Sequence, residues 1–90
     1  MENKLKEIPT YDHFLDTSGS FCPVPVTRTQ AKMAQMNSGE VLCVAATDPI
    51  SKIDLPAWCH SHKQEYLGYR IENNVIYNYL KRTKHAIRDL

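Results

Sequence analysis

Cys22 has the residue type and the sequence setting of a reactive thiol. It opens the string Cys22-Pro23-Val24-Pro25, between a short apolar segment and a stretch with helical periodicity. Pro23 favours an extended residue before it, and Pro25 has the fixed φ of a first helical turn. Unpaired N–H groups and the helix dipole stabilise a thiolate at such a position, so we expect the Cys22 pKa to lie below the ~8.5 of a free cysteine.

The other two cysteines have less reactive settings. Cys43 lies in an apolar run and is predicted to be buried and inert. Cys59 either packs at the edge of the core or approaches Cys22 as a resolving thiol, and the structural role is the commoner one for a buried free cysteine. The string Cys59-His60-Ser61-His62 invites a metal assignment, but a tight zinc site needs about four ligands and the sequence offers no matching second pair. We therefore predict no metal.

Three further side chains are candidates for supporting the thiol. Asp16 and Asp48 each follow a predicted strand, and parallel pairing would bring both to one sheet edge near the start of the first helix. Turn formation and capping are the ordinary roles there, with proton transfer as the alternative. Phe21 is the nearest large apolar side chain to Cys22, and it serves either as an anchor in a partner's pocket or as a staple that holds the loop on the helix.

The elements that position these residues follow from hydrophobic periodicity and turn residues. Gly19 ends the first strand, Asn37-Ser38-Gly39 ends the first helix, and Asn73-Asn74 marks a hairpin turn. The predicted segments are a tail (1–10), a strand (11–16), a helix (26–36), a buried strand (41–47), a second helix (from residue 50), and two strands (65–72 and 75–81). This β-α-β-α-β-β order predicts an α+β two-layer sandwich, with both helices on one face of a mixed four-stranded sheet.

The pattern also predicts which side chains of the second helix are buried and which face of the sheet two tyrosines share. Ile50, Ile53, Ala57 and Trp58 are predicted to form the buried face of the second helix, and Pro56 is expected to kink it or to mark where its regular part begins. Alternation places Tyr77 and Tyr79 together on one face of the sheet, the open one, either as a docking surface or as cross-strand pairs.

Length and composition restrict the class of protein. Ninety residues with 42% hydrophobic content predict one domain over residues 1–90 that folds without metal or disulfide. The first residues lack the apolar core of a signal peptide and no run is long enough to span a bilayer, so we expect a cytoplasmic protein. The net charge of +1 gives little attraction to membrane or nucleic acid. The basic tail (82–90) is expected to be solvated, with contact to an acidic partner or RNA as the alternative.

The string Asp16-Thr17-Ser18-Gly19 followed by Cys22-Pro23-Val24-Pro25 resembles the signature of the TusA (SirA-like) family of sulfur carrier proteins. The resemblance runs from Phe14 to Lys81 and includes three further segments, which are Asn37-Ser38-Gly39-Glu40, Asp48-Pro49 and Asp54-Leu55-Pro56-Ala57-Trp58-Cys59. The chain departs from the family at Ser18 and Ser20, where an Arg and a Leu are common, and at His62-Lys63-Gln64, where the family has a Gly-containing turn.

The resemblance implies a function and partners. Cys22 would accept sulfane sulfur as a persulfide from a cysteine desulfurase or a rhodanese-type donor and pass it to an acceptor protein, without a cofactor. Destinations in such families include thiolation of tRNA, molybdenum cofactor assembly and sulfur oxidation. We expect a monomer that needs no direct nucleic acid contact. The alternatives are a thiol–disulfide redox protein using Cys22 with Cys59, and a small RNA-binding module.

Overall fold

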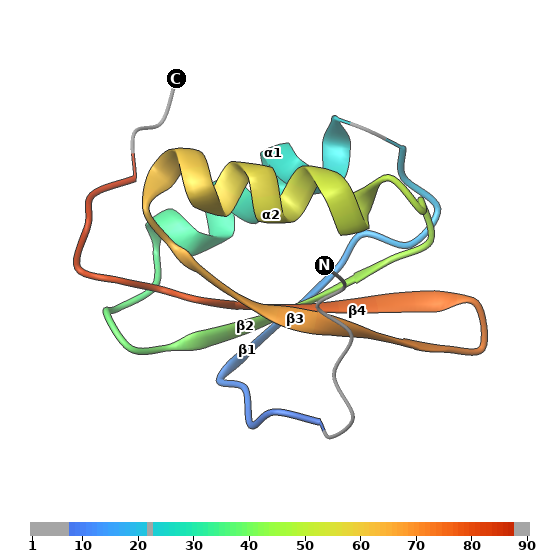
Figure 1. Cartoon of the computed structure of the whole chain (residues 1–90), viewed down its shortest axis with the longest axis horizontal. Helices are drawn as coiled ribbons and strands as arrows, with labels where there is room; N and C mark the ends of the chain where they lie inside the picture. The colour runs from blue at the N-terminus through green and yellow to red at the C-terminus, as the bar shows by residue number, and fades with distance from the viewer. Residues whose placement is uncertain (1–7, 22, 88–90) are drawn as a thin grey trace.

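The computed structural model describes residues 8–21 and 23–87, which form six elements in the predicted order. The elements are β1 (His13–Asp16), α1 (Val24–Ala34), β2 (Val41–Ala46), α2 (Ser51–His62), β3 (Glu65–Glu72) and β4 (Val75–Lys81). The strands form one mixed sheet in the order β1-β2-β4-β3, in which β1 is parallel to β2 and the other neighbours are antiparallel. Both helices cover one face of this sheet (Figure 1), so the predicted α+β two-layer sandwich is confirmed.

The core lies between the helices and the central strands. Leu42 and Val44 of β2 are fully buried in the cluster beneath the helices, and Cys43 between them is buried on the other face of the sheet. The main cluster of buried side chains is Met33, Met36, Leu42, Val44, Leu55, Trp58, Cys59 and Leu80. On α1 the predicted inward positions hold, with Thr29 and Met33 buried and Val26 packed against the cluster.

The buried face of α2 differs from the prediction. Ile50 and Ile53 are 45% and 65% exposed and Ala57 is exposed as well, so Trp58 is the one predicted position that is buried. The buried residues of the helix are Ser51, Leu55, Trp58 and Cys59. The buried residues also recur at helical spacing. A hydrogen bond from a buried amide favours this orientation of the helix over the predicted one. Asn78 of β4 is fully buried and donates from Nδ2 to Ser51 Oγ over 3.4 Å.

A tyrosine completes this polar contact beneath α2. The Tyr66 hydroxyl donates to Asn78 Oδ1 over 2.6 Å, so both ends of the Asn78 amide are engaged. Burying a polar side chain is tolerated when its hydrogen bonds are made, and this one fixes the rotation of α2 on the sheet. The helix also continues on both sides of Pro56, so its regular part does not begin there.

The other sheet face carries the aromatic side chains of β4. Tyr77 and Tyr79 share this face as predicted, and Arg70 of β3 contacts both: its guanidinium lies 4.5 Å from the Tyr77 ring centroid, and its Nε donates to the Tyr79 hydroxyl over 3.1 Å. Tyr79 is nevertheless only 1% exposed. The Tyr11 ring lies 6.3 Å from it, in the segment that passes below the sheet in Figure 1. This region therefore contains packed cross-strand pairs.

Two connections explain features of the sequence. Asn73 and Asn74 both have positive φ, at 52° and 66°, which is the backbone of a tight hairpin turn. Lys63 ends α2 in the left-handed region at φ 57°, the position that glycine usually occupies. None of the helices in the described part of the chain is long and apolar enough to cross a membrane.

Candidate functional site

The loop between β1 and α1 contains the candidate nucleophile. Cys22 itself lies outside the described residues, so the site is built from residues 17–21 before it and 23–28 after it. β1 ends at Asp16 and α1 begins at Val24. The sequence position of Cys22, two residues before the helix, is therefore the one that the motif predicts.

The first half of the loop is anchored to β2. Buried Thr17 uses both its backbone N–H and its hydroxyl to donate to the Ala45 carbonyl, over 2.8 and 2.7 Å. Gly19 N–H donates to Thr47 Oγ1 over 2.8 Å. Gly19 has a φ of +83°, and an added Cβ would meet no atom within 4 Å. Glycine is therefore favoured here by its backbone conformation and not by lack of space.

The second half of the loop starts α1. The Val24 N–H donates to the Phe21 carbonyl over 2.9 Å, and Thr27 N–H donates to the Pro23 carbonyl over 3.0 Å. Pro25 lies in the first turn, as predicted, and it is buried. The Val24 N–H is already hydrogen-bonded and Pro25 has no N–H, so neither of these backbone groups can donate to an anion. The positive end of the helix dipole therefore contributes more than they do to stabilising an anion here.

A cation lies against the same loop. Arg28 donates from its guanidinium to the Asp16 backbone carbonyl over 3.1 Å. The Asp16 carboxylate accepts a hydrogen bond from the Ser18 N–H over 2.9 Å, and hydrogen bonding by Ser18, helped by the charge of Arg28, lowers the pKa of Asp16. Asp16 thus stays ionised as a turn-forming acceptor. Its proposed support of the thiol chemistry stays a prediction.

Asp48 holds the start of α2 at the same sheet edge. This residue is buried, its Oδ1 accepts from the Ile50 N–H over 3.0 Å, and its carbonyl accepts from the Ser51 N–H over 3.0 Å. These are the bonds of a turn and helix start. Asp16 and Asp48 therefore both follow parallel strands beside the candidate thiol loop, each with a local hydrogen-bonding role.

The loop and the start of α2 form what we call the thiol end, residues 17–25 and 48–54. Both helices begin at this end of the sandwich (Figure 1). Its described residues include four large apolar side chains in solvent, with exposed fractions of 74% for Phe21, 43% for Val24, 45% for Ile50 and 65% for Ile53. Large apolar side chains that stay in solvent near a reactive group are typical of a protein-binding surface.

A groove of about 370 Å³ extends from the thiol end between the two helices. Trp58 forms part of its wall, where the indole N–H donates to Gln30 Oε1 over 2.9 Å and the ring stacks on His62 at 4.5 Å between centroids. The residues that line it are Pro23, Val26, Asp54, Ala57, Trp58, Ser61 and His62. The groove thus links α1 to α2 directly after the Cys22 position.

The other two thiols are buried and weakly acidic. Burial raises the pKa of Cys59 to about 12, and it also raises the pKa of Cys43. Each is about 1% exposed. This agrees with the prediction that Cys43 is structural and argues against Cys59 as a resolving thiol. Among residues 8–21 and 23–87, no cluster of His, Cys, Asp or Glu side chains could hold a metal ion.

Sequence reasoning missed two parts of the site. Ile50 and Ile53 were assigned to the core, although the alternative helical set that includes Ser51 and Leu55 was already visible in the spacing. Arg28 carried no sequence signal, because only the fold brings its guanidinium back to the residue that ends β1.

Comparison with known proteins identifies the family. The family model described as sulfurtransferase TusA matches residues 13–82. The putative sulfur carrier protein YrkF of Bacillus subtilis (strain 168) is 40% identical over 68 residues, which is 76% of this chain but 37% of YrkF. The putative sulfur carrier protein YrkI of the same organism is 38% identical over 65 residues, or 72% of this chain and 87% of YrkI. The chain therefore spans little more than a third of YrkF.

A solved structure supports the fold. The crystal structure of the SirA-like protein from Desulfitobacterium hafniense aligns with a TM-score of 0.72 and 24% identity, over 81% of this chain and 100% of that one. At this identity the likeness concerns the arrangement of helices and strands. The family is shown by the match of the family model over residues 13–82 and by the 38% identity to YrkI over 87% of its length: the chain belongs to the TusA family of sulfur carrier proteins.

Proposed function

We propose that this protein is a persulfide carrier that takes up sulfane sulfur on Cys22 and passes it to an acceptor protein. The observation that carries the proposal is the placement of the Cys22-Pro23-Val24-Pro25 string at the start of α1, in a chain whose other two cysteines are buried. Sulfurtransferase activity, with a cysteine desulfurase or rhodanese-type donor, belongs to this proposal, and so does a downstream use such as tRNA thiolation.

The proposed chemistry is an exchange between sulfur atoms that needs no external oxidant. The Cys22 thiolate attacks the terminal sulfur of the donor's persulfide and forms a new S–S bond, while the donor's own S–S bond breaks and its cysteine leaves as a thiolate. The product is a persulfide on Cys22. The acceptor repeats the step and returns Cys22 to the thiolate, so the transferred atom stays covalently bound throughout.

The surroundings of the loop suit this exchange. The dipole of α1 favours an anion at its first turn, whether a thiolate or a persulfide sulfur. Arg28 adds a positive charge beside the loop. The exposed Phe21, Ile50 and Ile53 offer an apolar surface that successive partners could share in weak, exchangeable complexes.

The direct test is mass spectrometry of the intact chain after incubation with a cysteine desulfurase and cysteine. We expect a gain equal to one sulfur atom that reductant removes. Cys22→Ala should abolish the gain, whereas Cys43→Ala and Cys59→Ala should retain it. Uptake that survives Cys22→Ala would refute the assignment.

Reactivity gives a second test of the same residue. Iodoacetamide modifies the thiolate, so the pH dependence of its reaction with the folded chain measures the pKa of the accessible cysteine. We expect the midpoint for Cys22 to fall below ~8.5. A midpoint at or above the value of a free cysteine would mean that the helix terminus does not activate it.

A further inference from the structure

The segment after β4 is folded back onto the C-terminal end of α2, although the sequence predicted a solvated tail. Gln64, which is buried, donates from Nε2 to the carbonyls of His62 and His85, over 3.0 Å each, and accepts at Oε1 from the Thr83 N–H over 2.8 Å. The Thr83 hydroxyl in turn donates to the Lys63 carbonyl over 2.7 Å. One buried amide therefore joins the end of α2 to residues 83–85.

Neighbouring contacts make this segment a fixed wall. Arg82 donates from Nε to the Met33 carbonyl at the end of α1 over 3.0 Å, and its terminal nitrogen donates to the Thr83 and His85 carbonyls. Ile87 packs against the main core cluster. The path of residues 82–87 is thus set by both helices and by the core.

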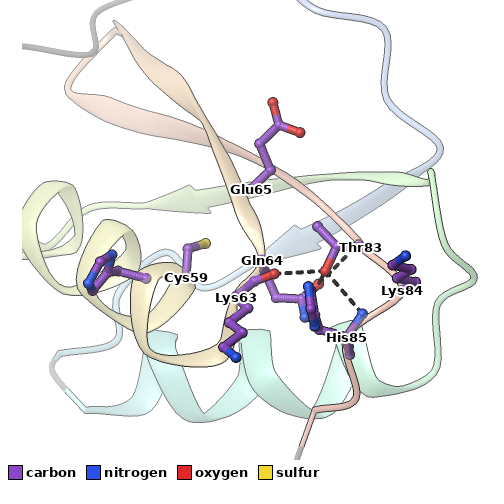
Figure 2. A pocket seen from close by; sticks show the side chains of 8 residues that line it. Cys59, Lys63, Gln64, Glu65, Thr83, Lys84 and His85 are labelled. Atoms are coloured by element: carbon purple, nitrogen blue, oxygen red, sulfur yellow. Dashed lines mark hydrogen bonds between the residues drawn. The ribbon is translucent and has the colours of Figure 1, made fainter.

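A cavity of about 660 Å³ lies between this wall and α2. Figure 2 shows the side chains that line it, with Gln64 and Thr83 joined by hydrogen bonds. Its lining includes Cys59, Lys63, Gln64, Thr83, Lys84 and His85. We call it the basic pocket.

The lining of the basic pocket contains two lysines and one glutamate, a formal charge of +1 with its histidines neutral. Lys63 and Lys84 are both exposed and come from its two walls, whereas Glu65 is the acidic side chain in the lining. Among the residues that the structure describes, neither lysine forms an ion pair. Two unneutralised ammonium groups around one cavity are notable in a chain with a formal net charge of +1. Such a site attracts carboxylates.

We propose that the basic pocket binds an acidic segment of a partner protein, with carboxylates placed against Lys63 and Lys84. A polypeptide fits the lining better than RNA does, because the cavity offers no Phe, Tyr or Trp ring on which bases could stack. Apolar side chains of the same segment would contact the aliphatic stems of the lysines.

The basic pocket lies at the end of α2 opposite the Cys22 loop, so a partner could occupy it while the loop stays accessible. α2 has 12 residues and is about 18 Å long, with the thiol end at its N-terminus and the basic pocket at its C-terminus. A partner held there leaves the Cys22 loop free to meet another protein, which would tether the carrier while sulfur is exchanged. The tethering consequence rests on the proposed function, whereas binding of the acidic segment does not.

The test is fluorescence anisotropy of the full chain with a fluorescein-labelled peptide in which glutamate alternates with leucine. We expect saturable binding that weakens as salt rises, and little binding of the same peptide with glutamine in place of glutamate. Lys63→Asn combined with Lys84→Gln should weaken binding roughly fivefold. Asparagine is chosen at Lys63 because it tolerates positive φ.

A control variant tests whether the loss of peptide binding depends on the position of the lysine and not on the total charge. Lys84→Gln and Lys52→Gln each remove one charge, and Lys52 belongs to the thiol end, so only Lys84→Gln should weaken binding. Equal effects, or no binding of the acidic peptide by the unaltered chain, would overturn the proposal. Tighter, Lys84-dependent binding of a uridine oligonucleotide would also overturn it.

Sulfur loading separates this proposal from the one on function. Lys63→Asn with Lys84→Gln should leave sulfur uptake from inorganic polysulfide unchanged, as measured by intact mass. Peptide binding without any uptake by the unaltered chain would contradict the proposed function and support the pocket. Normal uptake without peptide binding would do the reverse.

Discussion

The two ends of the helix layer are built by different means. At the thiol end, short hydrogen bonds such as the two that Thr17 donates to the Ala45 carbonyl shape the loop, and Phe21 and Ile53 remain in solvent. At the other end, the buried side chain of Gln64 forms hydrogen bonds with three backbone groups, one from the end of α2 and two from residues 83–85. Both ends bury polar groups, but the thiol end also exposes large apolar side chains, whereas the other end depends on one buried amide that links two segments.

This difference separates recognition from stability. Removing an exposed apolar side chain takes little from the core, so changes at the thiol end should alter function more than folding. Removing a buried amide leaves several backbone groups without partners, so changes at the Gln64 end should alter folding more than function. Single substitutions at each end test this separation.

The largest effect is expected for Gln64→Ala. It removes the hydrogen bonds to His62, His85 and Thr83, and we expect the free energy of unfolding to fall by about 3 kcal/mol. The melting temperature should drop by roughly 15 °C, as followed by circular dichroism. Sulfur uptake at a temperature where the variant stays folded should be nearly normal.

Gln35→Ala is the matched control, because Gln35 is an exposed glutamine. It should change the melting temperature very little. If Gln64→Ala melted like the control, Gln64 would not organise that end of the molecule.

The next effect is alkaline destabilisation through Cys59. Burial raises the pKa of this thiol to about 12 in the folded chain, against ~8.5 for a free cysteine. Between these values the unfolded chain loses the proton while the folded chain keeps it, so stability is fully present below the lower pKa and falls as pH rises toward the upper one. Urea unfolding from neutral to high pH should show this fall.

Cys59→Ala isolates that contribution. Burial also raises the pKa of Cys43, Tyr66 and Tyr79, and these groups remain in the variant. We expect stability to decline less steeply with pH in Cys59→Ala than in the unaltered chain. Identical slopes would indicate that the Cys59 thiol is accessible in the folded state.

Most of the fold could be predicted because the local signals agree with one another. The apolar run of β2, the Asn73-Asn74 turn and the periodicity of α1 all point to the same two-layer arrangement. The buried face of α2 could not be predicted, because two sets of residues have helical spacing. The choice between them depends on Asn78, which comes from β4.

The candidate site was predicted in part for a similar reason. A string of neighbouring residues around Cys22 carries the motif, and its position before α1 follows from the prolines. Contacts between distant segments determine three other features. These are the burial of Pro25, the hydrogen bond from Arg28 to the end of β1, and the folding of residues 82–87 onto α2. Sequence periodicity does not report such contacts.

A smaller effect should distinguish the two prolines of the motif. Pro25 is buried in the first turn of α1, whereas Pro23 is exposed. Pro25→Ala loses packing and also gives the unfolded chain more freedom, so we expect it to lower the free energy of unfolding by about 1–2 kcal/mol. Pro23→Ala should change it by less than ~0.5 kcal/mol. Denaturant unfolding measures both, and a larger loss for Pro23→Ala would reverse the assignment.

The smallest effect on stability is expected at the exposed apolar side chains of the thiol end. Phe21→Ala and Ile53→Ala should leave the melting temperature almost unchanged, because these side chains are 74% and 65% exposed. Each should slow sulfur uptake from a cysteine desulfurase roughly fivefold by weakening docking, while uptake from inorganic polysulfide stays normal. Ile71→Ala is the control, since Ile71 is 46% exposed on β3. A large drop in melting temperature with normal uptake would make Phe21 a structural staple, and equal slowing by Ile71→Ala would remove the thiol end as the docking surface.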